Sequence, residues 1–210
     1  GGYRMQIEID GLASHAGGAP EKGISAISIA ALAIADLQQN GWHGLIHKGK
    51  HSGTSNVGYI EGGEATNVVT DRVVIRAEAR SHHPGFRKRI VAAIEKAFRQ
   101  AVKQVPNSDG KTGKVRIKGR LDYESFRLTK TEPCVQAAQA AIESLGHSPL
   151  LTIANGGLDA NWITRHGIPT VSLGCGQANA HTVAETLNIR QYQLACQNAL
   201  QLATQTYGMK

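Results

Sequence analysis

Four stretches in the first part of the chain alternate apolar and polar residues with a period of two. They cover residues 3–10, 56–60, 72–80 and 115–123. Such alternation predicts β-strands that turn one apolar face to a core and one polar face to water. The two middle stretches are separated by the Gly-containing segment 61–64, so we expect them to pair through a connection longer than a tight hairpin.

Two further stretches have the period of a helix. Residues 24–38 are rich in Ala, Ile and Leu and stop at Asn40-Gly41, which is a typical C-terminal signal. After Pro84, apolar residues recur at steps of three and four as far as Val105. The resulting order is βαββαβ, which closes into a four-stranded sheet with both helices on one face. We therefore predict a ferredoxin-like domain over residues 1–128.

The second part, residues 129–210, alternates helices with short apolar strands. The pattern predicts helices at 132–145, 159–166 and 189–207, and strands at 150–154 and 168–173. Parallel strands joined by helices need neighbours on both sides, and two strands cannot bury enough area to stand alone. We expect this part to be a segment of a larger α/β domain that needs more strands than the chain supplies.

The composition is that of a globular protein, with 41% hydrophobic and 19% charged residues. No apolar run approaches the roughly 18 residues that a membrane span requires, so we expect no membrane partner. Three cysteines without paired spacing favour a reducing compartment, and hence the cytoplasm. The sequence opens at Gly1 with neither Met nor a signal-peptide pattern, which we interpret as a cut end.

The formal net charge of +7 raises the question of nucleic-acid binding. The basic residues alternate with apolar ones along the predicted strands, which is typical of the wet face of a half-buried sheet. Ferredoxin-like sheets that bind RNA carry aromatic residues on a central strand, and the candidate strand at residues 71–80 has none. We therefore expect no nucleic-acid partner. A nucleic-acid-binding module is the competing hypothesis from another functional class.

Two histidines are the candidates for chemistry. His181 lies in a loop of small residues after the predicted strand 168–173, and ligands of open α/β sheets bind at such strand ends. Glu185, four positions on, offers an oxygen partner for one nitrogen of that imidazole. His15 lies in a small-residue loop directly after the first strand, where an imidazole can donate to a developing oxyanion.

The remaining histidines do not complete a metal site. A catalytic zinc ion normally takes three protein ligands, and the chain has neither a His-x-Asp pair nor a His-Glu-x-x-His helix. We expect His47 and His51 in a loop and His82-His83 at a helix N-terminus.

Five motifs in this order resemble the dizinc exopeptidases of clan MH that carry an inserted lid domain, and especially their peptidase T-like (tripeptide aminopeptidase-like) branch. The resemblance spans nearly all of the chain, and the order and spacing of the motifs are more specific than any one of them. They are Ala13-Ser-His-Ala-Gly17, Ala65-Thr-Asn-Val-Val69, Gly156-Gly-Leu-Asp159, Gly167-Ile-Pro-Thr170 and His181-Thr-x-x-Glu185.

The resemblance implies roles for particular residues. His181 would be the C-terminal zinc ligand, and His15 would be the lid histidine that polarises the scissile carbonyl, often from the partner subunit of a homodimer formed through the lid. Asn67 would contact a short peptide substrate. The substrate loop would comprise three residues, namely Asn155, Gly156 and Gly157.

Two departures from the family pattern limit the expected function. Asn155 stands where the tripeptidase branch often has an Arg that binds the peptide carboxylate. This leaves open an acyl-amino-acid or dipeptide hydrolase of the same superfamily.

The other zinc ligands and the general base of the family would precede Gly1, so we expect a C-terminal portion that is inactive alone and supplies at most one ligand to two zinc ions. A dimerisation domain with degenerate catalytic remnants is a further alternative. For Asp159 we expect a structural role as a helix N-cap.

Overall fold

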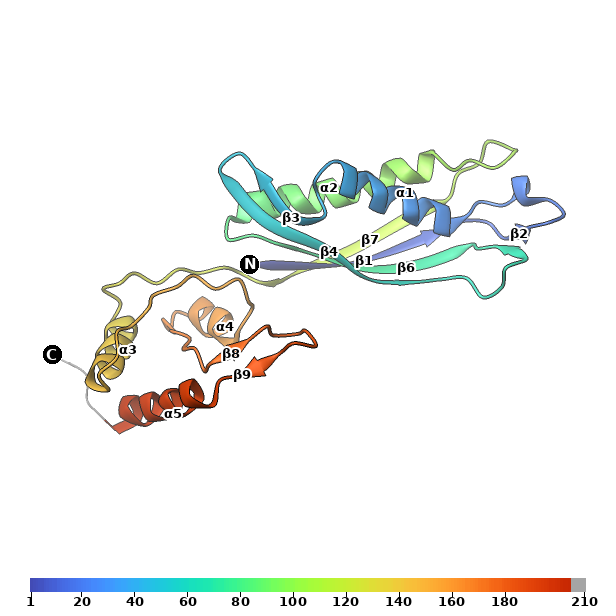
Figure 1. Cartoon of the computed structure of the whole chain (residues 1–210). Helices are drawn as coiled ribbons and strands as arrows, with labels where there is room; N and C mark the ends of the chain where they lie inside the picture. Colours follow the sequence, from blue (N-terminus) through green and yellow to red (C-terminus); the bar gives the residue numbers. More distant parts are fainter. Residues whose placement is uncertain (205–210) are drawn as a thin grey trace. The chain divides into compact units, whose positions relative to one another are not determined.

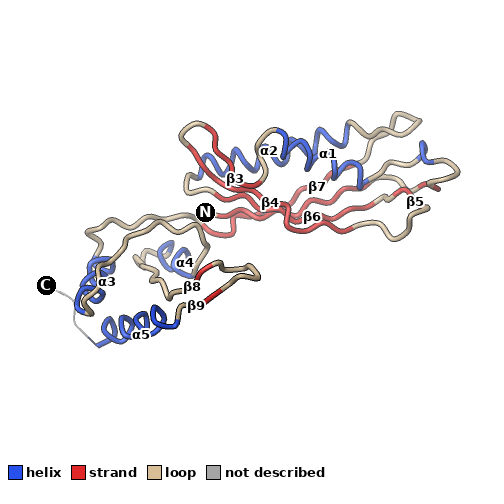
Figure 2. The backbone as a smooth tube through the Cα atoms, viewed as in Figure 1, coloured by secondary structure: helices blue, strands red, loops and turns tan. Residues whose placement is uncertain are grey.

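The computed structural model describes residues 1–204, shown in Figures 1 and 2. Contacts divide the chain into two compact units, Gly1–Ser125 and Phe126–Lys210, which we call the N-terminal and C-terminal units. Each is described by itself. Among the described residues, no helix is both long and apolar enough to cross a membrane.

The main part of the N-terminal unit is an antiparallel sheet covered on one face by two helices (Figures 1 and 2). The sheet has the strand order β3-β4-β6-β1-β7. Along the chain, the four strands other than β3 and the two helices follow the predicted order βαββαβ of a ferredoxin-like domain, which confirms the fold class. The elements are β1 (Gly2–Asp10), α1 (Ala26–Gln39), β3 (Gly44–Lys48), β4 (His51–Glu61), β6 (Arg72–Arg80), α2 (Pro84–Lys103) and β7 (Lys114–Tyr123).

The additional strand β3 corrects the prediction for His47 and His51, which do not lie in a loop. His47 is on β3 and His51 begins β4, and the two strands pair with Lys48 opposite His51. Only two residues join these strands, and Gly49 takes the left-handed conformation with φ 63°, which tight hairpins need. The sheet therefore has five strands instead of four.

The core of the N-terminal unit lies between the sheet and the helices. The fully buried side chains come from alternate positions of the strands and from one face of each helix, as the periodicity predicts. Each large apolar side chain buried here contributes about 1.5–3 kcal/mol. The largest of them are Phe86, Phe98, Ile7, Ile9, Ile29, Leu37, Ile46, Ile75, Ile90, Ile94 and Val73.

Side-chain caps fix where the two helices begin. The Ser25 hydroxyl accepts a hydrogen bond from the Ser28 N–H at the start of α1. His83 Nδ1 accepts one from the Phe86 N–H at 3.1 Å, which makes His83 the N-cap of α2 and confirms the prediction for this histidine.

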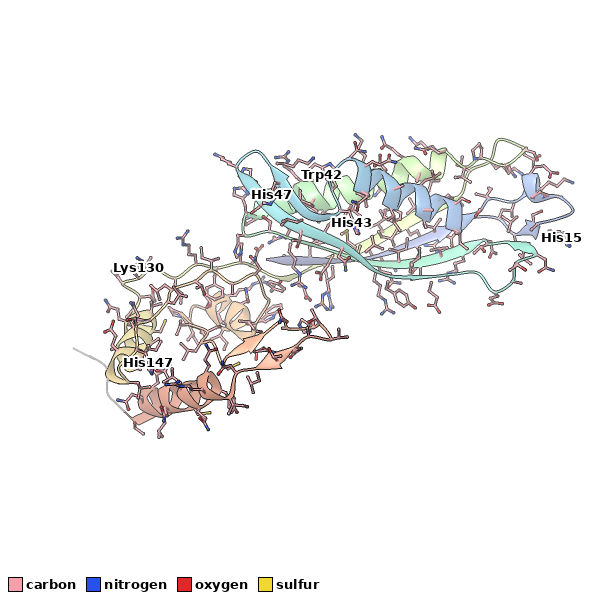
Figure 3. All side chains as sticks on the ribbon, viewed as in Figure 1. His15, Trp42, His43, His47, Lys130 and His147 are labelled. Carbon is pink, nitrogen blue, oxygen red and sulfur yellow. The ribbon has the colours of Figure 1, made fainter. Side chains whose placement is uncertain are left out.

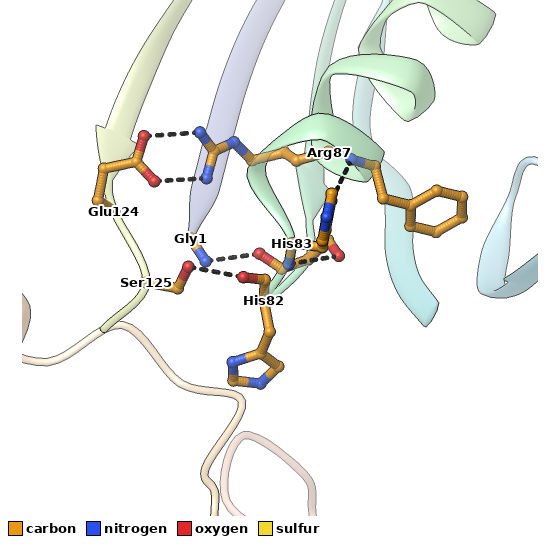
Figure 4. A network of polar contacts seen from close by, with 8 residues as sticks. Gly1, His82, His83, Arg87, Glu124 and Ser125 are labelled. Atoms are coloured by element: carbon orange, nitrogen blue, oxygen red, sulfur yellow. Dashed lines mark hydrogen bonds and ion pairs between the residues drawn. The ribbon is translucent and has the colours of Figure 1, made fainter. Parts of the chain in front are cut away.

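A polar network holds the two ends of the N-terminal unit against the start of α2 (Figure 4). The Arg87 guanidinium donates to both carboxylate oxygens of Glu124 at 2.9 Å, and the Arg87 side chain is only 4% exposed. The Gly1 nitrogen donates to the Ser81 carbonyl, and the Ser125 hydroxyl donates to the His82 carbonyl. The two ends of this unit thus lie next to each other.

The described residues of the C-terminal unit form three helices and one short strand pair. They are α3 (Pro133–Ser144), α4 (Asp159–Arg165), α5 (Ile189–Thr204), β8 (Gln177–Ala178) and β9 (Thr186–Leu187). The predicted helices are present, and the part of the last one around Tyr207 lies outside the described residues. Leu158 is the N-cap of α4 and Asp159 is its first residue, so the N-cap prediction for Asp159 was wrong by one position.

The predicted strands at 150–154 and 168–173 are not formed, and this prediction was wrong. A strand exists only when a neighbour satisfies its backbone groups, and no described residue pairs with either segment. Their apolar side chains are exposed: Leu150 is 85% exposed, Ile153 62% and Ile168 60%. Among the described residues of this unit, only Val135, Ala138, Ala141 and Ala160 are buried hydrophobics. The unit therefore has little core of its own.

The paired Glu124 carboxylate should stabilise the N-terminal unit. We expect Glu124→Gln to lower its free energy of unfolding by about 1–3 kcal/mol, because the buried Arg87 charge loses its counter-charge. The measurement is denaturant unfolding followed by Trp42 fluorescence in a Trp162→Phe background. The matched control is Glu95→Gln, which breaks the exposed Glu95–Arg99 pair at 3.7 Å and should change stability by less than about 0.5 kcal/mol.

The acid dependence gives this prediction a second readout. The Arg87 hydrogen bonds lower the pKa of Glu124 below its ordinary value of 4.5. The stabilisation is therefore present above that value and is lost as the pH falls through the lowered pKa. Equal effects of the two substitutions, or the same acid dependence with and without the Glu124 carboxylate, would contradict this account.

Candidate functional site

A second, two-stranded sheet brings two of the predicted site residues together. Strand β2 (Ser14–His15) pairs with β5 (Val68–Val69), with His15 opposite Val68. The Ala16 N–H then donates to the Asn67 carbonyl oxygen at 2.9 Å. His15 and Asn67 therefore lie side by side at one end of the N-terminal unit, where Figure 3 labels His15.

Hydrogen bonds from the main chain orient the His15 imidazole. Its Nδ1 accepts from the Gly17 N–H at 3.1 Å and from the Gly18 N–H at 2.9 Å. A nitrogen that accepts two N–H groups carries no proton, so in the neutral ring the proton is on Nε2. A side chain at Gly18 would come within 3.3 Å of Nδ1, so glycine permits this close approach. The exposed ring therefore presents Nε2–H as a donor for a carbonyl oxygen or an oxyanion.

His181 lies at the turn between β8 and β9 in the C-terminal unit. Its φ of 67° is in the left-handed region, which is unusual for a residue other than glycine. The His181 N–H donates to Glu185 Oε2 at 2.9 Å, and Gln177 donates to the other carboxylate oxygen at 2.6 Å. These bonds across the turn hold its backbone in the conformation that exposes His181.

Glu185 supports the His181 turn, as expected for this loop. Its carboxylate accepts from the main-chain N–H of His181 and not from the imidazole. The His181 N–H, followed by the Gln177 amide, lowers the pKa of Glu185, so the carboxylate stays ionised at neutral pH. A negative charge four residues from an exposed imidazole favours a cation at this turn.

The predicted substrate loop lies on the exposed segment before α4. A side chain at Gly156 would meet no atom within 4 Å, so the space around this glycine is open. Asn155 and Gly157 flank it and are also exposed. These three residues and His181 therefore belong to two separate loops of the C-terminal unit.

The described residues do not make a metal centre by themselves. Among residues 1–204 there is no group of three or more His, Cys, Asp or Glu side chains that could hold a metal ion. His181 could supply one imidazole, which is fewer than the three ligands that catalytic zinc normally takes. Among the described residues, His181 is therefore a single candidate ligand and not part of a metal centre.

Sequence reasoning missed the pairing of β2 with β5 and the two N–H donors to His15. Strands of two residues show no periodicity. The Gly17-Gly18 pair after His15 was the available signal, because successive glycines allow main-chain N–H groups to approach a side chain closely.

The orientation of His15 can be tested by nitrogen NMR. At about pH 8.5, where imidazoles are neutral, we expect His15 to be protonated at Nε2, because Nδ1 accepts two hydrogen bonds. Gly18→Pro removes one of the donors and should weaken this preference. A ring protonated at Nδ1 in the unsubstituted chain would show that the arrangement is wrong.

The chain is similar to known peptidases in both sequence and structure. The family model described as the M20 peptidase dimerisation domain matches residues 1–106. A tripeptidase structure from Staphylococcus aureus is 32% identical with a TM-score of 0.79, and it matches 96% of this chain over 50% of its own length. The aminopeptidase PepT structure from Bacillus cereus is 35% identical with a TM-score of 0.73, again over 96% and 50%.

A third structure shares the fold alone. The YxeP protein of Bacillus subtilis, described as a dinuclear metal binding peptidase of the M20 family, is 19% identical with a TM-score of 0.60, over 96% of this chain and 49% of its own. The chain thus spans about half the length of the structures it matches. Because the dimerisation-domain model covers half of its residues, the chain belongs to the M20 family of peptidases.

Proposed function

We propose that the protein containing this chain is a zinc-dependent aminopeptidase that cleaves short peptides such as tripeptides. The observation that carries the proposal is the His15 imidazole, whose ring is fixed by two main-chain N–H groups and presents Nε2–H to solvent. Two structures whose names describe peptidases of this kind match nearly the whole chain at 32% and 35% identity.

The proposal gives roles to residues of both units. His15 Nε2–H donates to the carbonyl oxygen of the scissile bond and to the oxyanion that develops from it. The Asn67 side chain contacts the substrate beside it. In the C-terminal unit, Asn155, Gly156 and Gly157 border the bound peptide, and His181 holds one zinc ion. Zinc, when bound, supplies a Lewis acid and an activated water. The remaining ligands and the general base would come from outside this chain.

The exposed apolar segments of the C-terminal unit support this division. Leu150, Ile153 and Ile168 would be buried if further strands paired with segments 150–154 and 168–173. We propose that those strands belong to the same protein, since the chain spans half the length of its matches. We further propose that the protein forms a homodimer through the N-terminal unit. The three free cysteines fit a cytoplasmic location.

One observation favours a second candidate within the same family. Asn155 cannot form the paired, charged hydrogen bonds that an Arg makes with a peptide carboxylate. Hydrolysis of acylated amino acids or dipeptides is therefore the second candidate. Tripeptides with a free amino terminus, dipeptides and N-acetyl amino acids, tested side by side on the complete zinc-loaded protein, distinguish these substrates by kcat/KM.

Removing the His15 imidazole should reduce catalysis more than substrate binding. In the complete protein we expect His15→Ala to lower kcat about 100- to 1000-fold with a small change in KM, because the lost donor acts mainly on the developing oxyanion. The matched control is His47→Ala, an exposed histidine on β3. Equal activity of the two variants would refute the role of His15.

His181 should control the metal content. We expect His181→Ala to reduce the zinc that the complete protein retains after dialysis, measured by atomic emission, because one ligand is lost. His147→Ala, which removes another exposed imidazole, should retain the zinc of the unsubstituted protein. If the His181 variant keeps all of its zinc, this histidine is not a ligand.

A further inference from the structure

The face of the large sheet that the helices leave open contains a shallow hollow of about 620 Å³. Strands β4, β6, β1 and β7 form its floor. Four cationic side chains line it, together with the polar side chains of Gln6, Asn56 and Tyr59 and a single carboxylate, that of Glu78. The four cations are Arg4, Arg76, Lys118 and Arg120.

Strand register places these cations in two adjacent rows. In one row, Arg4 on β1 lies directly opposite Arg120 on β7. In the next row, Gln6 on β1 lies between Arg76 on β6 and Lys118 on β7. Like charges directly opposite each other destabilise a sheet unless opposite charges compensate them, and Glu78 on β6 lies opposite Arg4 in the first row.

The carboxylates of the sheet do not neutralise the hollow. Asp122 lies 3.0 Å from Arg4 and 3.9 Å from Arg120, so one carboxylate serves two guanidinium groups. The Glu78 carboxylate pairs with Arg80, whose guanidinium contacts each of its two oxygens at 2.8 Å.

The positive charges of the second row, those of Arg76 and Lys118, are compensated even less by nearby carboxylates. Among the described residues, no carboxylate lies within 4.0 Å of the side-chain nitrogens of Arg76 or Lys118. The Arg76 guanidinium lies over the Tyr59 ring at 4.5 Å, which orders it without removing its charge. The adjacent row is different, because there Glu8 pairs with both Arg72 and Arg116. The excess of positive charge is therefore local to the hollow.

We propose that this hollow binds a small polyanion that carries a chain of two or three phosphate groups. The cations extend over about 10 Å across the strands and about 7 Å along them, which is more than a single phosphate can contact. Guanidinium and ammonium groups donate hydrogen bonds and accept none. Phosphate oxygens accept such bonds and carry the opposite charge, so the two kinds of group are complementary. Nucleic acid fits less well, because the one aromatic ring of the lining, Tyr59, is covered by Arg76 and cannot stack on a base. This site is independent of the proposed peptidase activity.

Calorimetric titration of the 210-residue chain with inorganic tripolyphosphate tests the proposal. We expect saturable binding of one ligand per chain, weaker binding of orthophosphate, and a loss of affinity as potassium chloride is raised. Arg76→Gln combined with Lys118→Gln should weaken binding at least 10-fold. The control pair is Arg99→Gln with Lys103→Gln on α2, which removes the same charge from the helical side of the unit and should leave affinity within about twofold of the unsubstituted chain. Circular dichroism would verify that both variants are folded.

The outcomes separate the proposal from its competitors. An equal loss in the two variant pairs would mean that only net charge matters, and the absence of saturable binding would mean an ordinary solvated face. Either result overturns the proposal. So does a short single-stranded RNA that binds more tightly than tripolyphosphate. ATP serves as a further arm: affinity equal to that for tripolyphosphate points to a free polyphosphate, and higher affinity points to a nucleotide, and both support a phosphate-chain site.

Discussion

The burial of one face of the sheet against α1 and α2 is the constraint on which the rest of the N-terminal unit depends. Because both helices lie on the same side, the alternate residues of every strand must face away from them. This requirement places the apolar residues of β1, β6 and β7 in a core and their charged residues on an open face. The sheet also fixes the strand ends, and β2 with β5 forms a separate support for His15 at one end of the unit.

The two units differ in how completely each buries its own apolar side chains. The N-terminal unit has a continuous core, capped helices and a buried Arg87–Glu124 pair where the chain enters and leaves. The C-terminal unit has helices but leaves Leu150, Ile153 and Ile168 exposed. The chain spans about half the length of the structures it matches, and we propose that the C-terminal unit completes its core with strands from the rest of the protein.

The sequence was sufficient to predict those elements whose periodicity reflects burial within the chain. The alternation in β1, β6 and β7 and the helical spacing in α2 arise because each has a partner to pack against here. Prediction failed for the edge strand β3, where exposed Leu45 stands next to buried Ile46 and breaks the alternation. It also failed for segments 150–154 and 168–173, whose apolar residues have no strand partner among the described residues. The proton position on His15 depends on two glycine N–H groups that no side-chain pattern reports.

In the function that we propose, His181 ligates one zinc ion of the complete protein. A crystal structure of the complete protein with data collected at the zinc absorption edge tests it most directly. The account predicts two zinc peaks, with a nitrogen of His181 at about 2.0–2.1 Å from one of them. Zinc peaks with the His181 ring directed elsewhere, or no bound metal in an active protein, would contradict it.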